Sequence, residues 1–448
     1  MPSPSRGPVW GQVHLSRRTY QAWAATVASL AKTPRSLLKP RSELSDLELT
    51  AAVIKEHRSD LVQLWETFTT ERADVSRYLM DPKRESLVYL LGFHLSNQAR
   101  AQGVMQRLAA RTSLFTYLSQ AQAPIHLIDL GCGTGALSLT AVEELKQLAP
   151  EAPLSVELVD KSQPFLEAAT HGLKAWLGDE ALTTRRQKLD EYFQREAAQG
   201  ARDGLTWYQL GYVWNEIAHQ AKTTQLLLKY LDAGLKKGKR LITLIEPATQ
   251  DLARAAMELR DELVERGYRV LYPCPHQEAC PMLERSRDWC YSEFAWERPP
   301  LSKVVDKILK VERHRLGASA YIFASPDLVE AMAALDPVAA TRPQAVVVGR
   351  PLDPSDRRRQ PTFEYLLCTP GGLVKEKPGE GPELLRGQTT EKPAPRKKSI
   401  DTAPGKVSTV RSASAESLPF IRPPVVKKVA PLSRPPSDKK KRKPKRGS

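Results

Sequence analysis

The sequence predicts an α/β fold with a doubly wound, mostly parallel sheet, an N-terminal helical domain, a cysteine-rich insertion and a small C-terminal β-extension. Two observations carry this expectation. Apolar runs of strand length alternate with segments of helical apolar spacing over residues 125–330, and a glycine-rich loop directly follows the first run. Such alternation requires parallel strands that are joined by right-handed crossover helices.

The chain divides into four expected parts. Residues 47–118 carry apolar residues at helical spacing and predict about four helices. The acid-free residues 1–42 resemble an organellar transit peptide, although we favour an ordinary N-terminal helix there. The parts are an N-terminal helical domain (1–118), an α/β domain (119–335) with a cysteine-rich segment (272–300), a β-extension (336–377) and a disordered basic tail rich in Pro, Ser and Lys (378–448).

The positive charge of the chain is concentrated in its tail. The net charge is +16, and the stretch from Arg386 onwards holds 18 basic and four acidic residues, a net +14. This tail suits a polyanion such as RNA, without sequence specificity, although a merely solubilising tail has the same composition. Since no apolar run approaches the roughly 18 residues of a membrane helix and the N-terminus lacks the apolar centre of a signal peptide, we expect a soluble, intracellular protein with no membrane partner. We also expect a monomer.

The glycine loop predicts a nucleotide-type site. The loop has the spacing G-x-G-x-G. Its glycines are Gly131, Gly133 and Gly135, and the first of them follows two residues after Asp129. Glycines allow a sharp turn and a close approach of the backbone to a ligand. The loop resembles motif I of the class I S-adenosylmethionine-dependent methyltransferases. Asp160 ends the next predicted strand, where a carboxylate can accept both ribose hydroxyls, although it can also cap the following helix.

Other polar residues are weaker candidates for a functional role. Asn215 and Glu216 follow the fourth strand, where methyltransferases of this class place catalytic side chains, but the Asn/Asp-Pro-Pro-aromatic box of amine methyltransferases is absent. A capping role for these two residues is equally compatible with the sequence. His94 and Arg100 can face a ligand, although we favour a packing role for them. No strand is predicted for residues 176–204.

A cluster of cysteines predicts a metal centre. Three of the five cysteines, Cys274, Cys280 and Cys290, lie within seventeen residues with the spacing C-x5-C-x9-C. Clustered thiolates in an intracellular protein favour a metal over packing. His276 as fourth ligand would give a zinc site, whereas Cys368 would give a four-thiolate set that suits zinc or a four-iron cluster. The residues alone do not separate these metals.

Several segments in one order and spacing carry a more specific resemblance. They are the glycine loop, NEI at the fourth strand, IEP before a helix, and then PCPHQEACPM, WC, ERPP, SAYIFAS, GRPL and LLCTPGGL. Together they resemble the methyltransferase-like small-ribosomal-subunit assembly factor family, known from mitochondria and with bacterial relatives. The resemblance covers residues 85–375, and the basic tail is not part of it.

The resemblance implies a cofactor, a cluster and a partner. It implies an S-adenosylmethionine pocket formed by Asp129, Gly131, Gly133, Gly135 and Asp160. It also implies a [4Fe-4S] cluster held by the cysteines at positions 274, 280, 290 and 368. The partner would be the small ribosomal subunit and its rRNA, in the bacterial cytoplasm or, alternatively, the mitochondrial matrix. An active rRNA methyltransferase and a zinc-containing methyltransferase of another substrate are the alternative functions, and the missing catalytic box leaves enzyme activity open.

Overall fold

The computed structural model describes residues 12–32, 40–69, 82–121, 123–196, 204–235, 238–335, 345–349, 365–376 and 386–390. All described residues belong to one compact unit, which lies within Met1–Asp401. Within the described residues, no helix is both long enough and apolar enough to cross a membrane.

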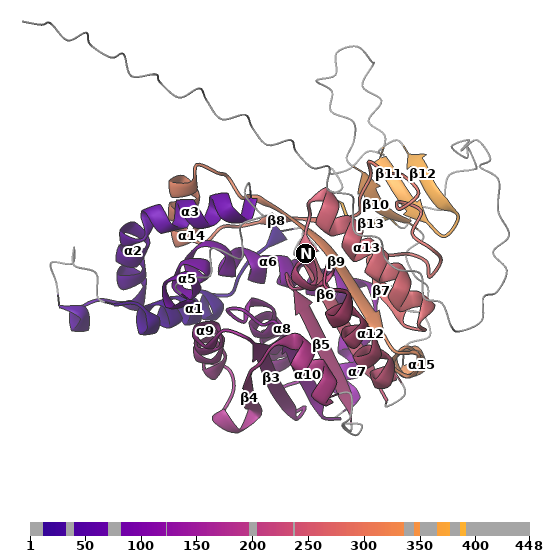
Figure 1. The fold of residues 1–448 in the computed structure, drawn as a ribbon, viewed down its shortest axis with the longest axis horizontal. Coiled ribbons are helices and arrows are strands. Elements are labelled where there is room, and N and C mark those ends of the chain that lie inside the picture. Colours follow the sequence, from indigo (N-terminus) through magenta and orange to yellow (C-terminus); the bar gives the residue numbers. More distant parts are fainter. Residues whose placement is uncertain are drawn as a thin grey trace, which may run out of the picture. The chain divides into compact units, whose positions relative to one another are not determined.

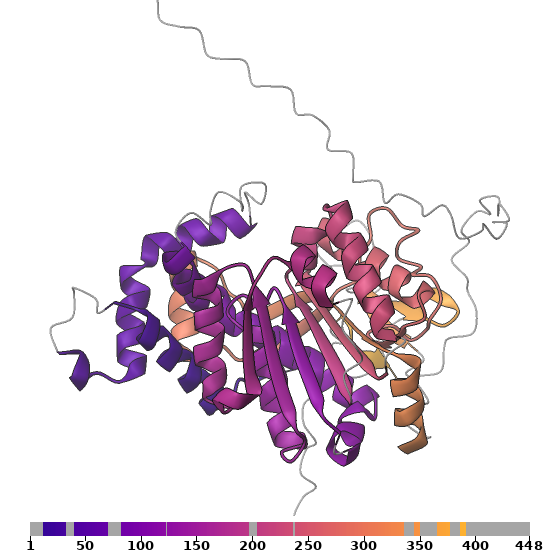
Figure 2. The same ribbon diagram turned by 60° about the horizontal axis from the view of Figure 1, so that its bottom comes forward.

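The described strands form a large sheet and a small one. The large sheet has the order β1-β8-β9-β6-β5-β2-β3-β4, and β7 also pairs with β9 (Figures 1 and 2). Strands β2 to β6 run parallel, whereas β9 runs antiparallel to β6, β7 and β8. Its strands are β1 (Gln12–Val13), β2 (Ile125–Leu130), β3 (Leu154–Asp160), β4 (Leu182–Arg186), β5 (Leu205–Gly211), β6 (Arg240–Pro247), β7 (Arg269–Tyr272), β8 (Ser292–Trp296) and β9 (Arg315–Ala324). This arrangement confirms the predicted doubly wound, mostly parallel sheet.

The degree of burial of a strand explains whether it can be predicted from the sequence. The central strand β5 is buried at six consecutive positions, because helices cover both faces of the sheet, and it therefore reads as a continuous apolar and aromatic run. Strand β4 lies at the sheet edge with four exposed residues in the sequence LTTRR. The sequence predicts no strand in this region, because an edge strand with little burial shows no apolar pattern.

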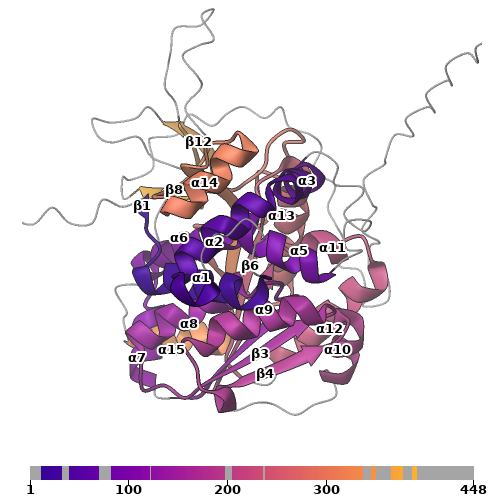
Figure 3. The same cartoon turned by 90° about the vertical axis from the view of Figure 1, so that its left-hand side faces the viewer.

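The N-terminal helices cover one face of the large sheet together with the crossover helices (Figure 3). Trp23, Val104, Leu127, Leu139 and Trp207 belong to one buried apolar cluster, so these helices share a core with the sheet. The helices on this side are α1 (Arg17–Leu30), η1 (Arg41–Glu43), α2 (Asp46–Glu56), α3 (Arg58–Thr69), α5 (Pro82–Tyr89), the π-helix η3 (Leu90–His94), α6 (Leu95–Arg111), α7 (Leu114–Ala121), α8 (Ala136–Leu148), α9 (Gln163–Lys174), η4 (Asp179–Ala181), α14 (Pro300–Leu309) and α15 (Pro326–Leu335).

A second set of helices covers the opposite face of the sheet. It consists of α10 (Leu189–Glu196), α11 (Trp214–Ile217), α12 (Ala221–Leu235) and α13 (Gln250–Glu265). Leu130, Leu227, Met257 and Tyr321 lie in the apolar cluster on this side. Cys274, Cys290 and Cys368 belong to the same cluster, with Cys280 packed against it, so this face carries the cysteine residues.

A small antiparallel sheet packs against the same side as α13. It has the order β12-β11-β10-β13 and consists of β10 (Ala345–Gly349), β11 (Tyr365–Thr369), β12 (Gly372–Glu376) and β13 (Thr389–Thr390). Cys368 in β11 pairs with Val346 in β10, and both share the apolar cluster of Met257. The composition of residues 378–448 predicts disorder, whereas Gly387 and Gln388 form backbone hydrogen bonds with Val347 and the next two residues form β13, which pairs with β10.

Candidate functional site

The glycine loop joins β2 to α8, and each of its three glycines has a positive φ. A Cβ at Gly131 would lie 2.6 Å from a methyl group of Val213, and one at Gly135 would lie 2.9 Å from the Cβ of Ala169. A Cβ at Gly133 would meet only Phe165, at 3.9 Å. Gly131 and Gly135 therefore permit close packing, whereas Gly133 faces open space, as a ligand-binding loop requires.

Asp160 holds this loop in place from the end of β3. Its carboxylate accepts hydrogen bonds from the backbone N–H of Gly133 at 3.0 Å and of Ser162 at 2.8 Å. Burial raises the pKa of Asp160 although these two amides counteract the shift. The predicted ribose acceptor thus adjoins the glycine loop, and each of its oxygens retains a lone pair for a further donor.

Asp129 lies below the loop. Its side chain is buried and accepts a hydrogen bond from the Ser138 hydroxyl in α8. Burial raises the pKa of Asp129 to about 7, and the nearby Asp160 adds to the shift. Asp129 therefore supports the loop through the start of α8. The neighbouring Cys132 thiol has a pKa well above its usual value because it is buried, so it is a poor nucleophile.

The end of β5 forms a turn that Glu246 holds from the end of β6. Tyr212 has a φ of 60°, which is rare for a residue with a side chain. Glu246, which is fully buried, accepts hydrogen bonds from the Trp214 backbone N–H and the Asn215 side-chain amide, both at 2.8 Å. Burial raises the pKa of Glu246 to about 8. Sequence reasoning did not assign Glu246 a role, although an acid that ends a buried strand was a visible signal.

Asn215 and Glu216, the weak catalytic candidates, differ in their surroundings. The Asn215 side-chain amide also donates to the Tyr212 carbonyl at 2.9 Å, so both of its hydrogens bind within the protein. Glu216 is half exposed and lies 3.5 Å from the Lys161 ammonium, one residue after Asp160. Asn215 therefore stabilises the turn, whereas Glu216 forms an ion pair beside the carboxyl end of β3.

The helices α5, η3 and α6, which precede β2 in the chain, pack near the glycine loop. Buried His94, in the π-helix, has its Nδ1 2.8 Å from the Thr134 hydroxyl in the loop, and burial lowers the pKa of His94 to about 3. Neutral His94 thus packs against the loop. The rings of Tyr89 and Phe165 make an edge contact at 5.8 Å. Arg100 donates to the carbonyl of Gly317 in β9 at 3.0 Å, a contact within the fold.

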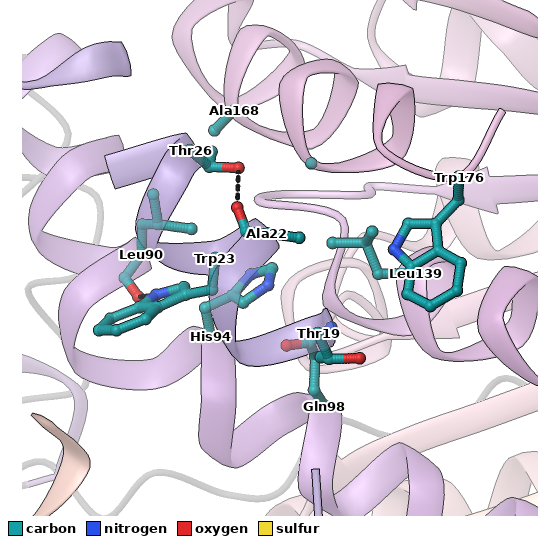
Figure 4. Close-up of a pocket in the computed structure, with 11 residues that line it drawn as sticks. Thr19, Ala22, Trp23, Thr26, Leu90, His94, Gln98, Leu139, Ala168 and Trp176 are labelled. Carbon is teal, nitrogen blue, oxygen red and sulfur yellow. Dashed lines mark hydrogen bonds between the residues drawn. The ribbon is translucent and has the colours of Figure 1, made fainter. Parts of the chain in front are cut away.

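A small internal cavity lies beside these helices. Its volume is about 10 Å³, and its lining includes Trp23, His94, Gln98, Leu139 and Trp176 (Figure 4). The side-chain oxygen of Gln98 is buried and has no hydrogen-bond partner among the described residues. This volume suits about one water molecule and excludes a nucleotide-sized ligand.

The structure brings the predicted metal ligands together from two parts of the chain. His276 Nε2 lies 3.3 Å from the Cys368 sulfur, which places β11 against the cysteine segment. The Cys280 backbone N–H donates to the Asp261 carboxylate at 3.0 Å, and the Cys290 N–H donates to the Met257 sulfur at 3.3 Å. Helix α13 therefore anchors two of the four cysteines.

The four thiols influence one another electrostatically. Burial raises the pKa of Cys280 to about 12, and the nearby Cys274 adds to the shift. Burial also raises the pKa values of Cys290 and Cys368, with further contributions from neighbouring cysteines. Without a metal, these three thiols stay protonated at neutral pH, and binding a metal would release their protons.

A buried cation lies beside the thiols. The Arg260 guanidinium is fully buried and donates to the carbonyls of His276 at 2.9 Å and Glu278 at 2.5 Å. Burial alone would lower the pKa of Arg260, but Cys274 and Asp261 raise it. Four cysteines and a fixed positive charge in an apolar surrounding are the residue types that a thiolate-bound metal group uses. In the described part of the chain, however, no three or more His, Cys, Asp or Glu side chains are arranged to hold a metal ion.

Comparison with solved structures finds similar proteins of low identity. A candidate RNA methyltransferase from Pyrococcus horikoshii is 15% identical, with a TM-score of 0.28, over 51% of this chain and 84% of that protein. An S-adenosylmethionine-dependent methyltransferase from Agrobacterium tumefaciens is 13% identical, with a TM-score of 0.28, over 48% of this chain and 59% of that protein. A precorrin-6y C5,15-methyltransferase from Geobacter metallireducens is 13% identical, with a TM-score of 0.27, over 48% and 88%.

Comparison with protein families identifies the chain. No curated protein sequence matches it significantly. One family model, described as "Mitochondrial small ribosomal subunit Rsm22", matches residues 86–323, which is more than half of the chain and includes the glycine loop, the β5 turn and three of the clustered cysteines. The chain therefore belongs to the Rsm22 family.

Proposed function

We propose that this protein binds S-adenosylmethionine and a [4Fe-4S] cluster and acts as a methyltransferase-like factor on the small ribosomal subunit. The observation that carries the proposal is the loop at Gly131, Gly133 and Gly135, which Asp160 tethers at the carboxyl edge of the parallel sheet. Doubly wound sheets bind nucleotide-type ligands at this edge. The Asp160 carboxylate would accept the ribose hydroxyls there.

Binding of S-adenosylmethionine has more support than methyl transfer. Both hydrogens of the Asn215 amide are engaged inside the protein, so this side chain holds the turn and leaves no donor for a substrate. Glu216 is the more accessible group, because it is half exposed beside Lys161. If transfer occurs on rRNA, orientation of the two bound reactants would supply most of the catalysis.

The cluster is assigned to Cys274, Cys280, Cys290 and Cys368. Support comes from their shared apolar surroundings, their electrostatic coupling and the buried Arg260, whose charge would offset that of the thiolates. A zinc ion held by the first three cysteines and His276 is the alternative. His276 lies against Cys368, so both possible fourth ligands are at hand.

The family description supports a role with the mitochondrial small ribosomal subunit. Of the two compartments that the sequence leaves open, we therefore propose the mitochondrial matrix rather than the bacterial cytoplasm. The protein would contact the rRNA directly, and the basic tail would add affinity by binding phosphates of the rRNA.

Calorimetric titration of the full-length protein with S-adenosylmethionine tests the pocket. We expect Gly133→Asp to abolish binding without unfolding the protein, because the site is open and aspartate tolerates a positive φ. Gly178→Asp is the matched control, since Gly178 is an exposed glycine that also has open space around it. Binding that survives Gly133→Asp would refute this pocket.

Metal analysis and visible absorbance of anaerobically purified protein test the cluster. We expect about four iron atoms per chain and broad visible absorbance. Serine at any of the four clustered cysteines should remove both signals, whereas Cys132→Ser, outside the cluster, should leave them unchanged. A colourless protein with one zinc per chain would replace the cluster by the zinc alternative.

A further inference from the structure

Helix α13 contacts both the cysteine segment and the turn beside the glycine loop within about one helical turn. The contacting residues are Arg254, Ala255 and Met257, which are close neighbours in the sequence. The two candidate sites therefore share one rigid element, although 57 residues of sequence lie between Glu216 and Cys274.

On the cysteine side, Arg254 provides the most extensive contact. Its guanidinium donates to three backbone carbonyls of the cysteine segment, those of Leu283 at 3.0 Å, Arg285 at 3.0 Å and Asp288 at 2.8 Å. These acceptors lie between Cys280 and Cys290. Because a planar guanidinium fixes several acceptors at once, Arg254 defines the path of this segment over α13.

On the pocket side, the Trp214 indole donates to the carbonyl of Ala255 at 3.1 Å. The backbone N–H of Trp214 also donates to Glu246, the penultimate residue of β6, the strand that precedes α13. The turn at residues 212–216 is therefore attached to both the strand and the helix. Its position affects the glycine loop, because Val213 lies directly against Gly131.

A second connection runs through the sheet. Glu246 in β6 pairs with Ser319 in β9, and the Ser319 hydroxyl donates to the carbonyl of Cys290 at 3.2 Å. Ser319 thus lies beside Glu246, which holds the turn at residues 212–216, and it also bonds to Cys290 of the cysteine segment. Two separate routes therefore connect the cysteines to the glycine loop.

We propose that Arg254 is a positioning residue for the nucleotide-type pocket, and that order in the cysteine segment is transmitted through α13 to the turn at residues 212–216. This inference rests on the proposed function for the identity of the ligand. If the cysteine segment loosens, the buried face of α13 loses its cover and the turn loses the support of Trp214. By linkage, a ligand bound at the glycine loop would in turn stabilise the cysteine segment.

The test compares two arginine variants, one on α13 and one at its C-terminal cap, in the full-length, anaerobically purified protein. Arg254→Ala removes the three carbonyl contacts, whereas the control Arg266→Ala removes ion pairs with Asp232 and Glu262 at the far end of the helix. We expect Arg254→Ala to weaken S-adenosylmethionine binding by about fivefold or more. It should also speed amide hydrogen exchange at residues 212–218, and Arg266→Ala should change neither quantity.

The two readouts separate this inference from the proposed function. If the wild-type protein does not bind S-adenosylmethionine, the proposed ligand is wrong, and the exchange rates at residues 212–218 still decide the inference. Faster exchange that is confined to residues 280–290 in Arg254→Ala, with unchanged rates at the turn, would overturn it. An equal effect of Arg266→Ala on the turn would also overturn it, because the response would then reflect general loosening of α13.

Discussion

Gly131 and Gly133 share a left-handed backbone, but their surroundings differ. Gly131 lies against Val213, whereas Gly133 faces open space. We expect Gly133→Ala to cost about 1–2 kcal/mol of unfolding free energy from its positive φ alone. Gly131→Ala should cost about 1–3 kcal/mol more, because its Cβ would overlap a stiff β-branched side chain. Urea unfolding of both variants measures the difference, and equal losses would contradict the packing role of Gly131.

Glu246 gives the stability a pH dependence of known sign. Its pKa is raised from 4.5 to about 8 in the folded protein, so the native state binds more protons than the unfolded chain between these values. Its contribution is therefore complete below about pH 4.5 and is lost as the pH rises towards 8, by at most about 1.4 kcal/mol per pH unit.

The substitution Glu246→Gln should remove this contribution. Because glutamine does not titrate, the unfolding free energy of the variant should fall less steeply between pH 6 and 8 than that of the wild type. Urea unfolding at several pH values measures the two slopes, and the comparison is unaffected by a constant loss of stability. Asp129 also has a raised pKa and supplies a slope of the same sign in both proteins. Equal slopes would show that Glu246 ionises normally.

The sequence predicted the types of residue at the site better than their roles. The glycine loop, Asp160 and the clustered cysteines were all visible, because glycine spacing and thiol clusters depend on local order. The internal bonds of Asn215 and the capping role of Glu246 were not visible, since they join β5 to β6 across 31 residues. Arg260 and Arg254 could not be singled out either, because an arginine on a helix usually lies in solvent.

Arg107 in helix α6 connects three elements of the fold. Arg107 donates to the carbonyl of Arg386 at 2.7 Å and also to the carbonyl of Glu293, and its guanidinium lies 4.4 Å from the Phe294 ring centroid. It therefore links α6, β8 and the segment that leads into β13. Since hydrogen bonds from charged donors are stronger than average, each contact stabilises the protein by about 1.5–3 kcal/mol.

The substitution Arg107→Ala should loosen the segment at residues 386–390. We expect faster proteolysis near Arg386 and a lower urea midpoint, with the helix content unchanged. The control Arg18→Ala removes a comparable stacking contact, with Trp176, and a single carbonyl bond at the opposite side of the helical layer. Cleavage near Arg386 at the same rate in both variants would show that Arg107 does not secure this segment.

Among the strands, those that are buried on both faces were predicted correctly from the sequence. The central parallel strands were identified because both of their faces are covered, which requires continuous apolar residues. Strand β4 was missed because its edge position leaves it exposed, and β13 was missed because two residues carry no periodicity. Cys368 in β11 was predicted as a possible fourth ligand from its chemistry alone, and the structure places its sulfur 3.3 Å from His276 Nε2.

The whole molecule separates a nearly neutral folded part from a basic tail. The first 385 residues contain 49 basic and 47 acidic residues, whereas residues 391–448 contain 17 basic and four acidic residues. Residues 386–390 belong to the small sheet, so a truncation that preserves the fold should end at Thr390. Such a truncation separates the electrostatic contribution of the tail from the binding surfaces of the folded unit.

Removing residues 391–448 should weaken the proposed binding to small-subunit rRNA and flatten its dependence on salt. Each phosphate contact that is lost should lower the slope of log K against log[salt] by about 0.7–0.9, because fewer counterions are released. Binding isotherms at several salt concentrations measure this slope. A charge control replaces the seven Lys and Arg residues among positions 439–446 by Gln, keeps the length of the tail and should give an intermediate slope. If the truncated protein retains the full slope, the phosphate contacts lie on the folded unit, and the tail does not contribute to RNA affinity.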